Sequence, residues 1–196
     1  LVTAADSELR SLADVVAKAK AHPKGTALGL YGIHFNLSAR LFEERSGVEL
    51  NVIPYPGPTQ TLTGLMGGTI QLALIDLGSA QPLVNSGKIR AIAVAGSNRH
   101  PLMPNVPTIS ESGYPGYTSQ TFLGFSINSK TPQPIAQKIE ELMQLAVKQP
   151  DFQEVATRTP GVEITGMPAK AFSDMIAAEA TQAERLIKSM GGKIPQ

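Results

Sequence analysis

The chain has 196 residues, of which 42% are hydrophobic and 17% charged, a composition typical of a folded globular protein rather than a disordered one. Its 17 basic and 16 acidic residues are interspersed and give a formal net charge of +1, so no basic stripe is available for phosphates and we expect no nucleic-acid partner. The absence of cysteine excludes disulfides, thiolate nucleophiles and thiolate metal sites.

Strand and helix signals alternate over the first 96 residues. Ser11 and Asp14 form a capping box at the start of a helix that ends before Pro23. Further patterns predict strands at 26–30, 48–53, 70–75 and 89–95, a helix that carries Leu37, Leu41 and Phe42 and ends at Gly47, a helix at 59–66 and a short helix at 81–85. Because parallel strands need crossover connections, this alternation predicts an α/β fold with a mostly parallel sheet and helices on both faces.

The pattern changes after Gly96. Residues 97–116 are dense in proline and glycine, which predicts a rigid surface excursion. The rest of the chain predicts an extended apolar segment at 122–127, a helix from Thr131-Pro132 to about 148, a short helix at 151–158, a strand at 162–165, and an amphipathic helix at 168–190 with Phe172, Ile176, Ala183 and Leu186 inward. Three helices against one or two strands have too little sheet for their apolar stripes, so we expect a partner or more chain to cover them.

A search for catalytic and metal motifs is negative. The three histidines, His22, His34 and His100, are far apart and have no metal-binding spacing, and no nucleophile elbow, Walker lysine or dinucleotide fingerprint is present. We therefore expect no catalytic residue, no metal site and no cofactor. An isomerase or lyase built on His34 and Asp76 remains an alternative, although the sequence names no supporting partner for either.

The chain carries no signal for direct membrane insertion. No apolar run approaches the roughly 18 residues of a membrane span. The first residues also lack the charged and apolar regions of a signal peptide, so we expect any targeting segment to have been removed.

Asp76 follows the predicted strand at 70–75. Open α/β sheets place ligand groups just beyond the carboxyl ends of their strands, which makes Asp76 a candidate binding residue. An aspartate at this place is equally typical of an N-cap for the helix that follows. Both interpretations stay open from the residue alone.

Two strand-to-helix turns are candidates for an anion site. The first consists of Tyr31, Gly32, Ile33, His34, Phe35 and Asn36, and the second runs from Tyr55 to Thr59. Because parallel strands emerge at one edge of a sheet, we expect both turns to lie at that edge, with free backbone N–H groups and positive helix dipole ends. Two such turns suit a carboxylate, whereas well-made turns without any ligand are the alternative.

Several segments resemble one family of receptors. They are LYGIHFNLSARLF, the turn at Pro54 to Gly57, the run into Gly67-Gly68, SGKIRAIAV at 86–94, LMPNVPTISESGYPG and TPQPIAQKI. These segments resemble the tripartite tricarboxylate transporter receptors, the Bug-type solute-binding proteins, and the resemblance extends over essentially the whole chain.

The resemblance implies a periplasmic binding protein type II-like fold, with two lobes, mostly parallel sheets and a hinge. It places residues 1–117 in the second lobe, and 118–196 as the crossover strand and the carboxy-terminal part of the first lobe. The family's amino-terminal part, with its glycine-rich turn, has no counterpart in this chain, so the first lobe is expected to be incomplete.

The resemblance also implies a function. It describes a periplasmic receptor that captures a small organic carboxylate between its lobes for the membrane subunits of a tripartite transporter. The residues that we expect to bind the ligand are Tyr31, Gly32, Ile33, His34, Phe35, Asn36, Thr59, Asp76 and Phe122. The family's aspartate aligns with Ile75, one position before Asp76, and Asn36 stands where the family has a histidine. The alternative function is the ligand-sensing effector domain of a transcriptional regulator, which would need a helix-turn-helix that this sequence does not show.

Overall fold

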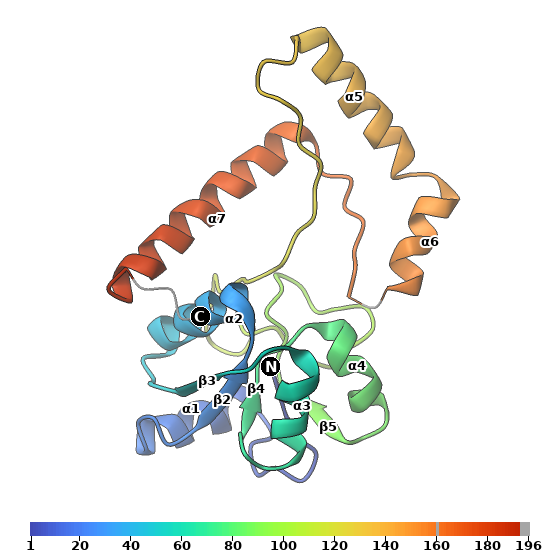
Figure 1. Cartoon of the computed structure of the whole chain (residues 1–196). Coiled ribbons are helices and arrows are strands. Elements are labelled where there is room, and N and C mark those ends of the chain that lie inside the picture. The colour runs from blue at the N-terminus through green and yellow to red at the C-terminus, as the bar shows by residue number, and fades with distance from the viewer. Residues whose placement is uncertain (160, 193–196) are drawn as a thin grey trace. The chain divides into compact units, whose positions relative to one another are not determined.

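A computed structural model describes residues 1–159 and 161–192 of the chain, which form two compact units (Figure 1). The first unit comprises Leu1–Thr121 together with the chain from Leu186 on, and the second unit comprises Phe122–Arg185. The assignment of 1–117 and 118–196 to two lobes stays a prediction.

A five-stranded sheet lies at the centre of the first unit. Its strand order is β3-β2-β4-β1-β5. The strands are β1 (Val2–Ala4), β2 (Ala27–Leu30), β3 (Asn51–Pro54), β4 (Leu72–Ala73) and β5 (Ile89–Ala91). β2 pairs in parallel with β3 and β4, while β1 is antiparallel to both β4 and β5. Four strands therefore run in one direction, which confirms the mostly parallel sheet, and β1 is an inserted strand that the sequence pattern did not predict.

Four helices cover the two faces of this sheet. They are α1 (Leu12–Ala21), α2 (Gly32–Ser46), α3 (Pro58–Met66) and α4 (Leu77–Asn85). The predicted capping box of Ser11 and Asp14 is present at α1, and Gly47 ends α2 with a φ of 66°, a conformation that glycine adopts without strain. Helix α4 begins earlier than the predicted helix at 81–85 because Asp76 caps it.

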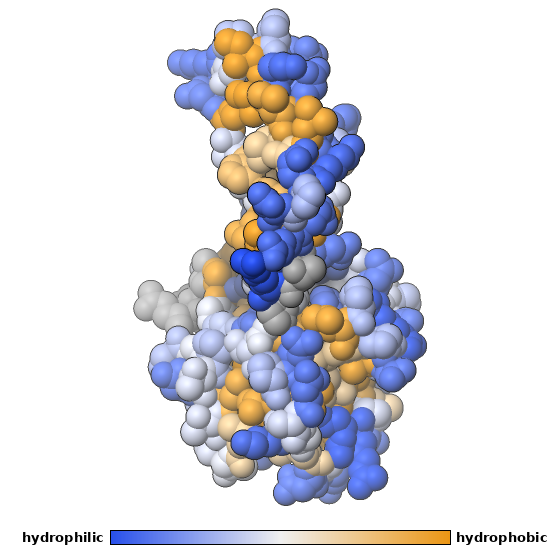
Figure 2. All heavy atoms as spheres, turned by 90° about the vertical axis from the view of Figure 1, so that its right-hand side faces the viewer, coloured by the Kyte–Doolittle hydropathy of each residue, from blue (hydrophilic) through white to orange (hydrophobic). Residues whose placement is uncertain are grey.

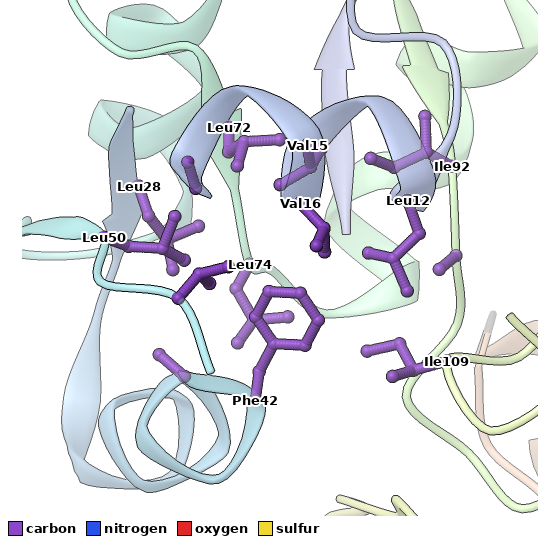
Figure 3. Close-up of a cluster of buried hydrophobic side chains, with 14 of the residues drawn as sticks. Leu12, Val15, Val16, Leu28, Phe42, Leu50, Leu72, Leu74, Ile92 and Ile109 are labelled. Carbon is purple, nitrogen blue, oxygen red and sulfur yellow. The ribbon is translucent and has the colours of Figure 1, made fainter. Parts of the chain in front are cut away.

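The alternation of side chains along the strands produces two hydrophobic clusters. Leu28, Leu30, Leu72 and Leu74 belong to the cluster that contains residues of α1 and α2, part of which Figure 3 shows. Ala27, Ala73 and Ile75 belong to the other cluster, with residues of α3 and α4. Successive residues of a strand point to opposite faces, so this division confirms that helices cover both faces of the sheet.

The proline-rich segment at 97–116 is tied back to the first unit. Thr108 forms a parallel bridge with Val94, and Arg99 lies 3.0 Å from Glu111 across the segment. The Tyr117 ring is buried and its hydroxyl donates to the Ser38 carbonyl at 2.9 Å, while burial raises the pKa of Tyr117 to about 12. These contacts give a physical basis for the predicted rigidity of the excursion.

The second unit has helices but no strand among its described residues. It contains α5 (Gln133–Ala146), α6 (Pro150–Arg158) and most of α7 (Ala169–Ser189). The strand predicted at 162–165 is absent, and the apolar segment at 122–127 lies outside any strand. Both patterns are typical of strands, but a strand needs a neighbour to accept its backbone hydrogen bonds, and neither segment has one among the described residues.

Apolar side chains of the second unit are consequently exposed. None of its described residues is buried, and Leu123 and Phe125 are 97% and 75% exposed. The exposed stripe of α5 consists of Ile135, Ile139, Leu142 and Leu145. Figure 2 shows hydrophobic side chains at the surface of this unit. The expectation that these helices have too little sheet to pack on is confirmed.

Leu186 points inward, as the helical periodicity predicts. It is 2% exposed and packs in the core of the first unit, whereas Ile176 of the same predicted apolar stripe is 41% exposed. The last turn of α7 also contacts α2, since Arg40 Nε donates to Ser189 Oγ at 3.4 Å. The expectation is confirmed for Leu186 and wrong for Ile176, because periodicity identifies an apolar stripe but does not identify the elements that cover each part of it.

No helix in the described ranges combines the length and apolarity needed to cross a bilayer.

Two positions of α7, Leu186 and Ile176, should respond differently to truncation of their side chains. Leu186→Ala in the 196-residue chain should lower the free energy of unfolding of the first unit by about 2 kcal/mol or more, because it leaves a cavity in a packed core. Ile176→Ala is the matched control, because Ile176 is 41% exposed, and it should cost less than about 1 kcal/mol. Hydrogen exchange of amides in β2 and β4 measures both effects. Equal, small effects of the two substitutions would contradict the packing of Leu186.

Candidate functional site

Three strand-to-helix turns meet at one edge of the sheet. The parallel register pairs Leu30 of β2 with Pro54 of β3, and Gly29 of β2 with Ala73 of β4. The turns into α2, α3 and α4 therefore leave the sheet on the same side (Figure 1). This arrangement confirms that the turns at Tyr31 and at Tyr55–Thr59 share an edge, and it adds Asp76 to them.

The first turn presents uncapped backbone at the start of α2. Tyr31 is the N-cap residue but makes no side-chain cap hydrogen bond. Gly32 has a φ of 65° and is exposed, with open space where a Cβ would lie. The N–H groups of Ile33 and His34, in the first turn of a helix, have no acceptor within that helix. Asn36 is buried and its amide donates to the Gly32 carbonyl at 2.9 Å, so this candidate residue supports the turn from inside.

The second turn is uncapped as well. Gly57 is the N-cap residue of α3, with extended backbone and no side-chain cap. Pro58 has no N–H group, so the first free donors of this helix are the N–H groups of Thr59 and Gln60. Thr61 Oγ1 donates to the Gly57 carbonyl at 2.9 Å and fixes the turn. Thr59 itself is exposed at this edge.

The third turn is capped by Asp76. Its Oδ1 atom accepts a hydrogen bond from the Ser79 backbone N–H at 2.8 Å, which confirms the interpretation of Asp76 as an N-cap residue. Its Oδ2 atom accepts a hydrogen bond from the Tyr31 hydroxyl. The two N-cap residues, Tyr31 of α2 and Asp76 of α4, are therefore joined directly across the edge of the sheet.

These contacts set the charge of the pair. Desolvation acts to raise the pKa of Asp76, but the hydrogen bonds from Tyr31 and Ser79 outweigh it and hold the pKa below its ordinary value of 3.8. Burial, followed by the hydrogen bond to Asp76, raises the pKa of Tyr31 above its ordinary value. At neutral pH the pair is thus a neutral phenol that donates to an ionised carboxylate.

Aromatic rings surround the start of α2. The ring of Phe35 lies 4.7 Å from that of Tyr31 and 5.3 Å from that of His34, measured between centroids. His34 Nε2 lies 3.5 Å from Ser119 Oγ. Burial lowers the pKa of His34, so this histidine is neutral at neutral pH. Ile33, by contrast, is 45% exposed.

Phe122 belongs to the second unit. Its ring packs edge-on against Phe172, with centroids 5.6 Å apart. Its contact with a ligand stays a prediction, as do the ligand contacts of the other candidate residues. Among the described parts of the chain, no group of three histidine or acidic side chains is placed to hold a metal ion.

Two participants at this edge are not among the predicted binding residues. Ser79 lies three residues after Asp76, and that spacing between a cap and its donor was available as a signal. Ser119 is separated from His34 by 85 positions, and no local pattern reveals such a contact.

The cap at Asp76 yields a test of stability. Asp76→Ala should lower the free energy of unfolding of the first unit by about 1 kcal/mol at pH 7, because the Ser79 N–H loses its acceptor. Asp76→Asn is the matched control, since asparagine caps helices equally well, and it removes only the charge. Urea unfolding of the three proteins provides the comparison, and a wild type no more stable than the alanine variant would contradict the cap.

The charge contribution of Asp76 should depend on pH with a definite sign. Its folded-state pKa is lowered, so the stability that the ionised form adds is fully present above its ordinary value of 3.8 and is lost as the pH falls through the folded-state pKa. The difference in unfolding free energy between the wild type and Asp76→Asn should therefore vanish in strong acid. A difference that grows on acidification would contradict the assignment.

Known proteins resemble the chain along almost its whole length. The family model described as "Tripartite tricarboxylate transporter family receptor" matches residues 1–192. A "UPF0065 protein in tcbD-tcbE intergenic region" of Pseudomonas sp. strain P51 is 27% identical over 190 residues, which cover 95% of this chain and 56% of that protein. The chain spans about half the length of this curated relative.

Solved structures resemble the fold. An R. palustris protein solved with adipate is 26% identical, with a TM-score of 0.74 over 97% of this chain and 64% of that chain. A solute-binding protein from Polaromonas has a TM-score of 0.85 at 22% identity, over 96% of this chain and 65% of that chain. These likenesses confirm the expected α/β fold of periplasmic binding proteins, of which the chain spans about two thirds.

Proposed function

The chain belongs to the tripartite tricarboxylate transporter receptor family, and we propose that it acts in a periplasmic receptor that captures a small organic carboxylate without changing it chemically. The observation that carries the proposal is the pair of uncapped helix N-termini, α2 and α3, at one edge of the sheet. Their free N–H groups and positive dipole ends suit an anion. In this proposal, membrane subunits of a tripartite transporter receive the ligand.

The likeness to a protein solved with a dicarboxylate supports this choice of ligand. The R. palustris relative was solved with adipate and is 26% identical to this chain. A charge-assisted hydrogen bond contributes roughly 1.5 to 3 kcal/mol, and a dissociation constant of 1 μM corresponds to about −8.2 kcal/mol. Four such bonds at the upper end contribute about 12 kcal/mol, and after an association cost of about 4 kcal/mol they leave about 8 kcal/mol, which corresponds to micromolar affinity.

The neighbours of the first turn fit a binding role. His34 is neutral, so it adds no charge to the turn, and the exposed side chain of Ile33 leaves the backbone N–H as the polar group at that position. The rings of Tyr31 and Phe35 provide an apolar wall for a carbon chain. Thr59 and Phe122 complete the proposed set of ligand contacts.

Receptor function is favoured over catalysis because the candidate acid and base do not form a unit. The polar contact of the His34 ring is Ser119, whereas the two oxygens of Asp76 accept from Tyr31 and Ser79. His34 and Asp76 therefore have separate partners, and these contacts do not join the two residues as an acid–base pair. A sensing domain would share the fold, but family membership favours the transport receptor.

We propose that the apolar faces of the second unit are covered in the whole protein. The relatives contain chain that this match does not cover, and the exposed stripe of α5 and the segment at 122–127 are apolar surfaces of a kind that proteins bury. Once it is covered, the second unit would supply further hydrogen bonds to the ligand, in addition to those from the starts of α2 and α3. A receptor with only half of these bonds would bind its ligand orders of magnitude more weakly, since each 1.4 kcal/mol is about tenfold in affinity.

Hydrogen exchange tests this coverage. Amides of α5 in the 196-residue chain should exchange orders of magnitude faster than those of α2, because α5 buries no side chain. In the whole protein the amides of α5 should become protected to a similar degree as those of α2. Unchanged exchange of α5 in the whole protein would contradict the proposal.

A single N–H group tests the binding role of the first turn. Ile33→Pro in the whole protein removes the backbone donor at a first-turn position where helices tolerate proline. Ile33→Ala is the matched control, because it removes the same side chain and keeps the N–H group. Calorimetric titration with adipate and other organic acids should show affinity at least about tenfold weaker for the proline variant. Equal affinities would exclude this N–H group from the site, and a wild type that binds no organic acid would exclude the proposed function.

A further inference from the structure

The hydrogen-bonded pair of Tyr31 and Asp76 places a negative charge beside the turn proposed to hold an anion. Tyr31 is the N-cap residue of α2, and its hydroxyl donates to Asp76 Oδ2. Because the Tyr31 side chain connects the two, the carboxylate of Asp76 lies about one tyrosine side chain away from the backbone at the start of α2. A ligand bound at that turn meets Asp76 as a neighbour.

The charge of Asp76 has no cation to balance it among the described residues. No lysine or arginine of the described chain forms an ion pair with Asp76, whose partners are the Tyr31 hydroxyl and the backbone N–H and side chain of Ser79. The side chain is also exposed at the edge of the sheet. A second carboxylate close to Asp76 would be repelled. This repulsion weakens the binding of ligands that carry carboxylates but no hydroxyl or amino group.

Asp76 retains the capacity to accept further hydrogen bonds. An ionised carboxylate has about four acceptor positions, and Asp76 uses part of them for the Tyr31 hydroxyl and for the backbone N–H and side chain of Ser79. Ser79 and Tyr31 hold the two oxygens in place from α4 and from the start of α2. The remaining acceptor positions suit a hydroxyl or an amino group and do not suit a carboxylate.

Tyr31 has a supporting part in this arrangement. Its hydroxyl proton is directed to Asp76, and its raised pKa keeps the phenol neutral. The hydroxyl is therefore committed as a donor to Asp76, and its effect on the ligand passes through the orientation of that carboxylate. Tyr31 is a positioning residue for Asp76.

We propose that Asp76, positioned by Tyr31, selects carboxylates that carry a hydroxyl or amino group on their carbon chain over plain carboxylates of the same length. The inference rests on the proposed function, since it concerns the ligand of the same site. The carboxylate of the ligand binds the free N–H groups of the turn, and its donor group binds Asp76. This division of contacts turns an unfavourable neighbouring charge into the source of specificity.

The test uses matched pairs of acids that differ by one hydroxyl or amino group. Calorimetric titration of the whole protein with propionate and lactate, with succinate, malate and aspartate, and with adipate and 2-hydroxyadipate gives the ratio of affinities within each set. In the set with the tightest binding, the wild type should prefer the substituted acid by about tenfold or more, the contribution of one charge-assisted hydrogen bond. Equal affinities within every set would overturn the inference and leave the proposed function standing, whereas no binding of any acid would overturn the proposed function.

Variants separate the role of Asp76 from a general effect of charge. Asp76→Asn keeps a helix cap and should reduce the preference to below about threefold while it strengthens binding of the plain acid. Tyr31→Phe should reduce the preference partly. Asp6→Asn removes the same charge beyond the end of β1, whose Ala4 pairs with Ile89 at the start of β5 and so lies at the opposite edge of the sheet. That control should keep the preference of the wild type, and an Asp76→Asn variant that also keeps it would overturn the inference.

Discussion

Parallel pairing of β2 with β3 and with β4 is the constraint on which the candidate site depends. Because the three strands run in one direction, the chain must leave each of them at the same edge and begin a helix there. Nine residues of helix or more follow each turn, so each turn is the positive end of a helix dipole. The site therefore results from topology before any particular side chain is considered.

The three turns differ in how their donors are satisfied. Asp76 caps α4 within the protein, whereas α2 and α3 begin without a side-chain cap. A helix start whose N–H groups are hydrogen-bonded within the protein has fewer free donors for a ligand than an uncapped helix start. The hydrogen bond between Tyr31 and Asp76 links a capped turn to an uncapped one. The carboxylate that caps α4 therefore also accepts a hydrogen bond from the N-cap residue of α2 and places a negative charge near the start of that helix.

Local patterns predicted the elements that are stabilised locally. The capping box at Ser11, the glycine stop at Gly47 and the cap at Asp76 each depend on residues within a few positions, and each is present. The inserted strand β1 has three residues, and only its antiparallel neighbours identify it. The contact of Ser119 with His34 likewise depends on the tertiary fold.

In the second unit, residues 122–127 and 162–165 have the composition of strands but no strand beside them in the described chain. Leu186, by contrast, is buried because the end of α7 packs with the first unit. Hydrophobic pattern thus specifies which side chains need burial, while the partner that buries them is a property of the whole fold.

In the proposed receptor, free backbone N–H groups at this edge of the sheet hold the carboxylate of a small ligand. A crystal structure of the whole protein with the organic acid that it binds most tightly would show whether they do. We predict a carboxylate oxygen about 3 Å from backbone nitrogens in the first turns of α2 and α3. A ligand bound elsewhere, with these N–H groups facing only water, would contradict the proposed role of the uncapped helix starts.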